Sequence, residues 1–121
     1  SLENVLQKAR IFISRNHALP AELEFAENLG ITEIIPCGSS GIKVGLIASG
    51  EGEIYVVSGG NTGEWDTCAP DIIIHEAGGI MTDMQGRKLV YNKKLLKNEN
   101  GFVVTNNLLH EDVILALKKI F

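Results

Sequence analysis

The segment EWDTCAPDIIIHEAGG, from Glu64 to Gly79, places one carboxylate, Asp66, at the expected start of a helix. Proline is tolerated near a helix start, where its missing N–H would have no intrahelical partner. Thr67 is therefore predicted as the N-cap and Pro70 as the third helical residue, with Asp66 just outside the helix. A carboxylate there can compensate the helix dipole, or it can bind Mg²⁺, which is commonly held by one or two carboxylates together with substrate phosphate. A helix N-terminus also attracts phosphate directly, and residue chemistry alone leaves these alternatives open.

Two further segments carry polar side chains that could bind an anion. Ser14-Arg15-Asn16-His17 follows a β-branched and aromatic run, and Gly38-Ser39-Ser40-Gly41-Ile42-Lys43 joins a predicted strand to a predicted helix. Taken alone, His17 is typical of a surface histidine at a strand end. Either serine is a plausible helix N-cap, and Lys43 is typical of a solvated helix charge.

Strands and helices alternate along most of the chain, which predicts a single α/β domain over residues 1–121. We expect layers, with a mixed, mostly parallel sheet flanked by helices. The helix that follows Trp65 is expected to end near Ala77, before two glycines. The other predicted helices are Pro20–Leu29, Ile42–Ala48 and Leu108–Ile120, and the predicted strands are Ile11–Ser14, Thr32–Pro36, Ile54–Val57, Ile80–Asp83, Leu89–Tyr91 and Gly101–Thr105.

Composition excludes several classes of function. Lys and Arg number 11 against 15 Asp and Glu, and the positive residues are scattered, which argues against a nucleic-acid partner. The two cysteines, Cys37 and Cys68, lack the spacing of a zinc site or disulfide framework, so reduced thiols are expected. No apolar run approaches the roughly 20 residues of a membrane span, and the N-terminus lacks a signal-peptide pattern. A cytoplasmic protein without a membrane partner is predicted.

The opening motif resembles a known family signature. Trp65-Asp66-Thr67-Cys68-Ala69-Pro70, followed by Glu76-Ala77-Gly78-Gly79 and Thr82-Asp83, resembles the C-terminal signature of the inositol monophosphatase superfamily, which comprises magnesium-dependent, lithium-sensitive sugar and nucleotide phosphatases. The segments that end at His17 and Lys43 resemble Ser-Arg-x-His and Gly-Ser-Ser-x-x-Lys of its 3′(2′),5′-bisphosphate nucleotidase branch. The resemblance extends from about Ile11 to the C-terminal helix, and the usual substrate of that branch is 3′-phosphoadenosine 5′-phosphate or its sulfated relative.

The resemblance implies roles for individual residues. Asp66 would be a magnesium ligand that also meets the substrate. The residues implied in contacts with the nucleotide and its non-scissile phosphate are His17, Ser39, Ser40 and Lys43. The remaining residues of the motif are interpreted as structural: Trp65 and the isoleucines Ile72, Ile73 and Ile74 as packing, Glu76 as a helix-surface acid, and His75 and His110 as surface histidines.

The chain also departs from the family pattern. No aspartate begins the Asp-Pro-x-Asp-Gly-Thr segment that, with an N-terminal glutamate, supplies most of the metal site, so the chain matches only the C-terminal half of such an enzyme. Phosphoryl transfer to water in this family requires clustered metal ions, and one carboxylate cannot hold them. Little or no activity is predicted for this chain alone. The arginine that nucleotidases usually carry near the position of Val57 is missing, as is the glutamate of inositol monophosphatases.

The preferred hypothesis is the C-terminal domain of a magnesium-dependent phosphatase that removes the 3′-phosphate from 3′-phosphoadenosine 5′-phosphate. An inositol monophosphatase or another sugar phosphatase of the superfamily is the enzymatic alternative, and a non-catalytic phosphate- or nucleotide-binding module is the other. Loss of half of a two-domain enzyme would expose apolar surface, so self-association through that face is expected.

Overall fold

The computed structural model describes residues 4–14, 20–38, 40–57, 64–89 and 101–120, without the side chains at 14, 20, 21, 40, 64–69 and 120. Helices and strands alternate as the sequence predicts. The short 3-10 turn η1, which sequence analysis missed, comes first. The elements in chain order are η1 (Leu6–Lys8), β1 (Arg10–Ser14), α1 (Pro20–Asn28), β2 (Glu33–Cys37), α2 (Ser40–Ala48), β3 (Ile54–Val57), α3 (Glu64–Glu76), β4 (Ile80–Thr82), β5 (Phe102–Thr105) and α4 (His110–Ile120).

The strands form one five-stranded sheet in the order β2-β1-β3-β5-β4. β1 pairs parallel with β2 and with β3, in a register that places Ser14 opposite Cys37 and Phe12 opposite Tyr55. β5 pairs antiparallel with both β3 and β4, so it alone runs against the other described strands. The expectation of a mixed, mostly parallel sheet is confirmed.

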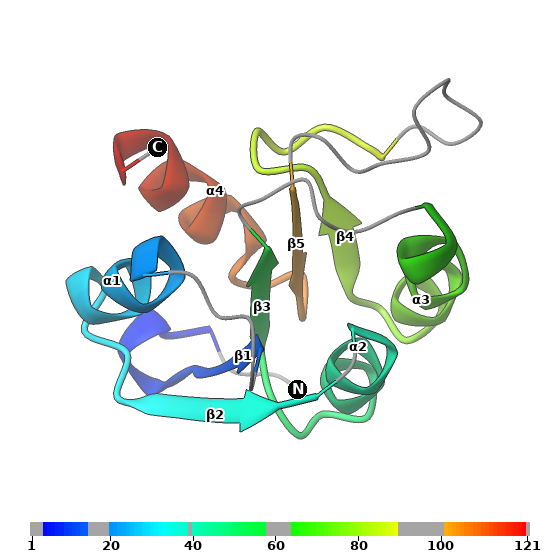
Figure 1. Ribbon diagram of the computed structural model, residues 1–121, viewed down its shortest axis with the longest axis horizontal. Helices are drawn as coiled ribbons and strands as arrows, with labels where there is room; N and C mark the ends of the chain where they lie inside the picture. The colour runs from blue at the N-terminus through cyan, green and yellow to red at the C-terminus, as the bar shows by residue number, and fades with distance from the viewer. Residues whose placement is uncertain (1–3, 15–19, 39, 58–63, 90–100, 121) are drawn as a thin grey trace.

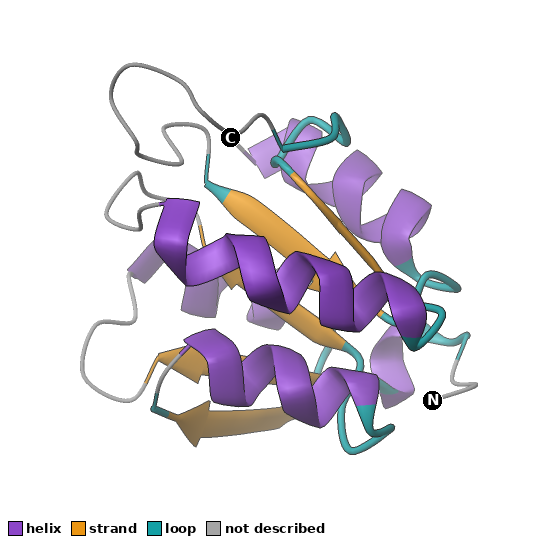
Figure 2. Ribbon diagram, turned by 90° about the vertical axis from the view of Figure 1, so that its right-hand side faces the viewer, coloured by secondary structure: helices purple, strands orange, loops and turns teal. Residues whose placement is uncertain are grey.

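Helices cover both faces of the sheet (Figure 1), with α1 and α4 on one face and α2 and α3 on the other. Alternate residues of the strands point to opposite faces, so Ile11 and Ile54 pack under α1 and α4 while Phe12 and Tyr55 pack under α2 and α3. α2 and α3 lie side by side across the sheet (Figure 2). This three-layer arrangement is the expected α/β architecture.

The start of α3 differs from the prediction. The helix begins at Glu64, so Asp66 is its third residue, Thr67 is not the N-cap, and Pro70 lies inside the helix. Pro70 removes the hydrogen bond to the Asp66 carbonyl, and its ring crowds that carbonyl. Because the N–H groups of a first helical turn have no intrahelical partner in any case, the turn before the proline can still form. The proline therefore constrains the hydrogen bonds of α3 and does not mark its start.

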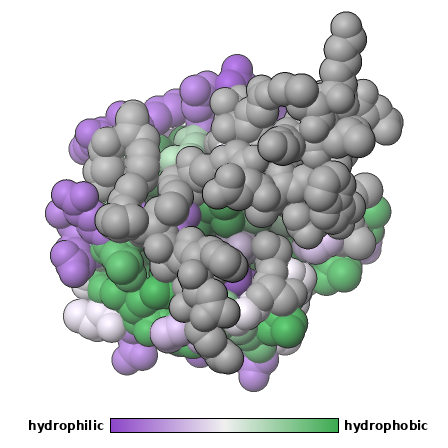
Figure 3. All heavy atoms as spheres, in the orientation of Figure 1, coloured by the Kyte–Doolittle hydropathy of each residue, from purple (hydrophilic) through white to green (hydrophobic). Residues whose placement is uncertain are grey.

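Two of the three isoleucines of α3 do not pack in the core. Ile74 is buried, whereas Ile72 is 63% and Ile73 is 53% exposed. Helical periodicity explains the correction, because one residue in three or four of α3 faces the sheet, here Asp71 and Ile74. Other apolar residues are exposed as well, among them Ile42 on α2, and Figure 3 shows hydrophobic residues among hydrophilic ones on one face of the molecule.

His110 was expected on the surface, and this expectation is wrong, because the residue is only 7% exposed. It starts α4 between the ends of β4 and β5, where Thr82 and Thr105 satisfy its two ring nitrogens. The prediction of a helix from Leu108 is two residues early, because Leu109 N–H donates to the side chain of Asn106 in a turn before α4. His75 and Glu76 are exposed, as predicted.

The helix ends and the segment at Leu89 can also be compared with the predictions. α1, α2 and α3 are followed by Gly30, Gly50 and Gly78, each with a positive φ, the conformation in which a glycine commonly ends a helix. The predicted strand Leu89–Tyr91 is not confirmed at Leu89, which is not in a strand, and its other two residues lie outside the described part. Among the described residues no helix is long and apolar enough to cross a membrane.

Candidate functional site

The candidate site lies at the edge of the sheet where β1, β2 and β3 end. Because these strands are parallel, their last residues, Ser14, Cys37 and Val57, lie at the same edge. α2 begins three residues after β2, and α3 follows β3, so both helices start on this side. Helix N-termini carry a positive partial charge, and open α/β sheets bind ligands beyond the carboxyl ends of their strands. The position suits an anionic ligand.

Lys43 is the predicted site residue that the structure describes in full. Its side chain is buried, with the residue 2% exposed, and its ammonium donates a hydrogen bond of 3.0 Å to the carbonyl of Cys37. The same nitrogen lies 4.9 Å from the centre of the Tyr55 ring. The alternative of a solvated surface charge is therefore wrong.

The surroundings of Lys43 affect its proton affinity in opposite directions. Burial lowers the pKa of Lys43 from its ordinary value, while the nearby Cys37 and Glu22 oppose that decrease. Glu22, in the first turn of α1, is itself only 6% exposed. A lysine is thus held within the core directly behind the turn that joins β2 to α2.

The hydrogen bond from Lys43 has a structural consequence for this turn. It ties the first turn of α2 to the last residue of β2, and so it fixes where the helix N-terminus points. A buried ammonium requires such partners, because removal of a charge from water is costly. Whatever binds at the start of α2 meets a backbone that Lys43 holds in place.

Asp66 lies in the first turn of α3, one helix away from Lys43. The structure gives its backbone and not its side chain, so its role as a magnesium ligand stays a prediction. Ser40 begins α2, again with only its backbone described, and His17 and Ser39 lie outside the described residues. The described part of the sheet edge therefore brings Lys43 and the two helix starts together, and the other predicted contacts stay predictions.

No group of three His, Cys, Asp or Glu side chains that could hold a metal ion exists among the described residues. Val57 ends β3 half-buried against the core, so it adds no charge at the position where an arginine was expected. Cys37 is a free thiol, as predicted.

Sequence analysis missed Tyr55 and Glu22. A signal for Tyr55 was present, because strand alternation places it on the face opposite Ile54, the same face as the α2 side chains. The burial of Lys43 also had a signal, since Val44 and Ile47 follow it at one and four residues and form the buried stripe of α2. Glu22 had a similar signal, since Phe25 and Ala26 follow it at three and four residues and are buried in the core.

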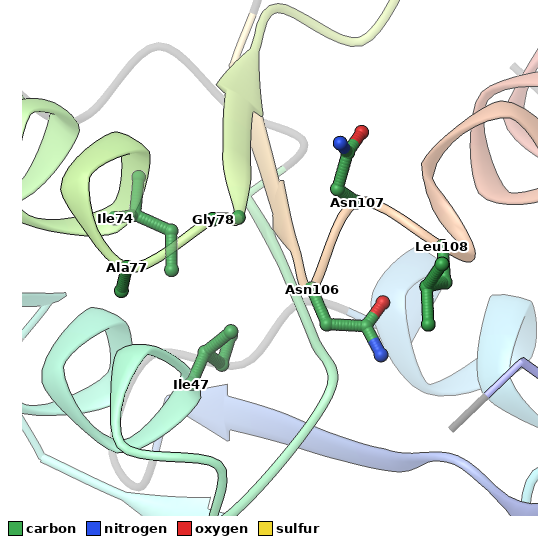
Figure 4. A pocket seen from close by; sticks show the side chains of 8 residues that line it. Ile47, Ile74, Ala77, Gly78, Asn106, Asn107 and Leu108 are labelled. Carbon is green, nitrogen blue, oxygen red and sulfur yellow. The ribbon is translucent and has the colours of Figure 1, made fainter. Parts of the chain in front are cut away.

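A separate cavity of about 300 Å³ lies at the opposite edge of the sheet (Figure 4). It is lined by Ile47 and Ile74 near the ends of α2 and α3, by the two glycines before β4, and by Asn106–Leu108 after β5. None of the described residues that line it is charged. This cavity therefore does not suit a phosphate, and it is distinct from the candidate site.

The chain belongs to the inositol monophosphatase family, whose sequence model matches residues 3–120. It is 31% identical over 85 residues to mouse 3′(2′),5′-bisphosphate nucleotidase 1, an alignment that covers 70% of this chain and 28% of the relative. It is 48% identical over 58 residues to 3′(2′),5′-bisphosphate nucleotidase CysQ of Aggregatibacter actinomycetemcomitans, covering 48% of this chain and 21% of the relative. The predicted resemblance to this superfamily and its nucleotidase branch is confirmed.

The fold matches solved structures of the same family. The inositol monophosphatase from Anabaena (Nostoc) sp. PCC 7120 superposes with a TM-score of 0.81 at 21% sequence identity, over 100% of this chain and 47% of that chain. This chain thus spans less than half of that structure, and 28% and 21% of the length of the two nucleotidases.

Proposed function

We propose that this chain is the C-terminal domain of a magnesium-dependent phosphomonoesterase that removes the 3′-phosphate from 3′-phosphoadenosine 5′-phosphate. The observation that carries the proposal is the buried ammonium of Lys43, which is hydrogen-bonded to the end of β2 beside the N-terminus of α2. A positive charge and a helix start in one place are suited to a phosphate group. The relatives named as bisphosphate nucleotidases support the nucleotide as the molecule that carries this phosphate.

In this proposal the chain's own residues bind and orient the nucleotide. The N-terminus of α2 faces the non-scissile phosphate, and Lys43 holds that helix start and contributes its positive charge. His17, Ser39 and Ser40 contact the same end of the substrate. Asp66 is the proposed magnesium ligand. Bound magnesium would supply charge neutralisation on the phosphoryl oxygens and activation of water.

We propose further that the 121-residue chain alone has little or no phosphatase activity. One carboxylate does not hold the metal cluster that this chemistry requires, and the described residues supply no other set of three ligands. The exposed isoleucines of α2 and α3 support the accompanying proposal of self-association through that face. A cytoplasmic location is part of the same proposal.

The second candidate is an inositol monophosphatase or another sugar phosphatase of the family. It is favoured by the solved structures that the chain matches in fold, one of which is named as an inositol monophosphate-bound enzyme. The third candidate is a non-catalytic phosphate- or nucleotide-binding module. It is favoured by the intact Lys43 arrangement in a chain whose described residues form no metal cluster.

The first test measures magnesium-dependent phosphate release from 3′-phosphoadenosine 5′-phosphate and from inositol monophosphate, with Asp66→Asn as the matched variant. We expect no release from the 121-residue chain. Release that Asp66→Asn abolishes would refute the proposed inactivity, and a preference for inositol monophosphate would favour the second candidate.

Calorimetry separates the binding module from an incomplete enzyme. Tight binding of 3′-phosphoadenosine 5′-phosphate without magnesium would support the module. We expect magnesium-free binding to be weak, because the charge of the substrate is then met by few protein groups.

A further inference from the structure

The ring of Tyr55 lies against the Lys43 ammonium, and the proposed function gives this tyrosine no role. We propose that Tyr55 is a positioning residue whose ring face holds Lys43 as a buried cation at the end of β2, where its positive charge stays available to a phosphate ligand. The part of this proposal that concerns the ligand rests on the proposed function. The part that concerns the lysine stands on the geometry alone.

The position of the ring is fixed from several sides. Tyr55 is only 3% exposed and lies within β3, which is paired with β1 on one side and β5 on the other. Its ring meets that of Phe102 on β5 edge to face, with centroids 5.5 Å apart and an interplanar angle of 81°. The Lys43 nitrogen lies 4.9 Å from the Tyr55 centroid. This distance is within the range in which an aromatic ring attracts an ammonium.

A ring stabilises a buried cation in a way that a carboxylate does not. A carboxylate in a close ion pair cancels the charge, whereas the quadrupole of a ring attracts the cation and leaves its net charge in place. Within the described part of the chain, no carboxylate forms a salt bridge with Lys43; the ion pairs found there join Arg10 to Glu53, His75 to Asp71 and Arg87 to Asp83. The close contacts of the Lys43 ammonium include two neutral partners, the Cys37 carbonyl and the Tyr55 ring.

Ionisable groups on neighbouring elements act on the same ammonium. Glu22 on α1 and the thiol of Cys37 on β2 both raise the proton affinity of Lys43, against the larger effect of burial, which lowers its pKa. The first turn of α2, which carries Lys43, contains no acidic residue. Tyr55 adds a contribution from β3, and this contribution can be separated from the others by substitution.

NMR of the ligand-free chain tests the geometry. In the wild type, the Lys43 Hε resonances should be shifted upfield by the ring current of Tyr55. Titration of these resonances should show that Tyr55→Leu lowers the proton-binding constant of Lys43 about tenfold, while Tyr55→Phe, which keeps the ring face, changes it by less than about twofold. Phe25→Leu is the matched control, because it removes an equally buried ring from the core cluster on the other face of the sheet.

Calorimetry with 3′-phosphoadenosine 5′-phosphate and with inorganic phosphate tests the consequence for binding. Tyr55→Leu should weaken binding of both probes about tenfold relative to Tyr55→Phe. Unshifted wild-type Hε resonances, or equal pKa values for Lys43 in Tyr55→Leu and Tyr55→Phe, would overturn the proposal. If the wild-type chain binds neither probe, the proposed function fails for this chain, and the NMR result still decides the role of Tyr55. If Tyr55→Leu does not fold, the wild-type ring-current shift decides it, because it reports directly whether the ring face lies against the Lys43 side chain.

Discussion

Acidification should destabilise this protein through one buried histidine. The Nε2 atom of His110 lies 2.7 Å from the Thr82 hydroxyl, which itself donates to the Asp83 carbonyl. Nδ1 lies 3.0 Å from the Thr105 hydroxyl, which accepts from the Asn107 N–H. These donors are consistent with a neutral ring that carries its proton on Nε2 and accepts at Nδ1. A second proton, on Nδ1, would face the Thr105 hydroxyl, which is itself the donor in that contact.

The size of the effect follows from the pKa. Burial lowers the pKa of His110 from 6.5 to about 4. Between these two values the unfolded chain binds a proton that the folded chain does not, so the free energy of unfolding falls as the pH falls. Each pKa unit corresponds to 1.36 kcal/mol, so His110 should cost about 3 kcal/mol between pH 7 and pH 4. Below pH 4 both states bind the proton and the loss from this residue ends.

Urea denaturation followed by circular dichroism at pH 7, 6, 5 and 4 measures this loss. His110→Gln lacks the titrating group, so its stability should fall less steeply over this range than that of the wild type. Parallel profiles for the wild type and His110→Gln would refute the reasoning, since carboxylates titrate alike in both.

Two further predictions concern buried contacts away from the site. The side chain of Glu53 is 1% exposed and accepts hydrogen bonds of 2.6 and 3.1 Å from Arg10. Arg10→Leu would leave this buried carboxylate without its cation, so it should lower the free energy of unfolding by about 3 kcal/mol. Adding Glu53→Gln removes the buried charge and should restore part of the lost stability. Full stability of the single variant in denaturant titrations would contradict this. A Cβ at Gly79 would meet the Thr105 carbonyl at 2.6 Å, whereas one at Gly45 within α2 meets nothing within 4 Å. Gly79→Ala should therefore lower the thermal midpoint and destabilise by about 1–3 kcal/mol, while Gly45→Ala should raise the midpoint.

The elements of this fold follow closely from sequence patterns, because each helix or strand is a local feature. The helix α2 and the strand β3 were predicted to within two residues, and the glycine stops mark real helix ends. Pro70 led to a wrong start for α3. Proline is tolerated near a helix start because it lacks an N–H, but its presence does not show that the helix starts there. The placement of β5 between β3 and β4 depends on pairing between distant segments, which no local pattern encodes.

The candidate site was predictable in its residue types and not in its contacts. The motif pointed to Lys43, yet the groups that act on its ammonium include Tyr55, which is 12 positions further along the chain, and Glu22 in another helix. His110 shows the same limit, because the threonines that make a buried histidine acceptable come from two other strands. The partners that a buried polar residue meets come from distant parts of the chain, and a single sequence does not display them.

The position of β5 in the sheet also constrains the order in which the protein can be assembled. β4 pairs with β5 within the described sheet and with no other strand there. β4 therefore has no partner for its backbone groups until the chain has passed residue 100 and returned antiparallel beside β3. Closure of this long connection is an entropic cost that precedes the gain from pairing. The three parallel strands can form from the first half of the chain, whereas β4 and the face beneath α3 are completed only after the last strand is in place.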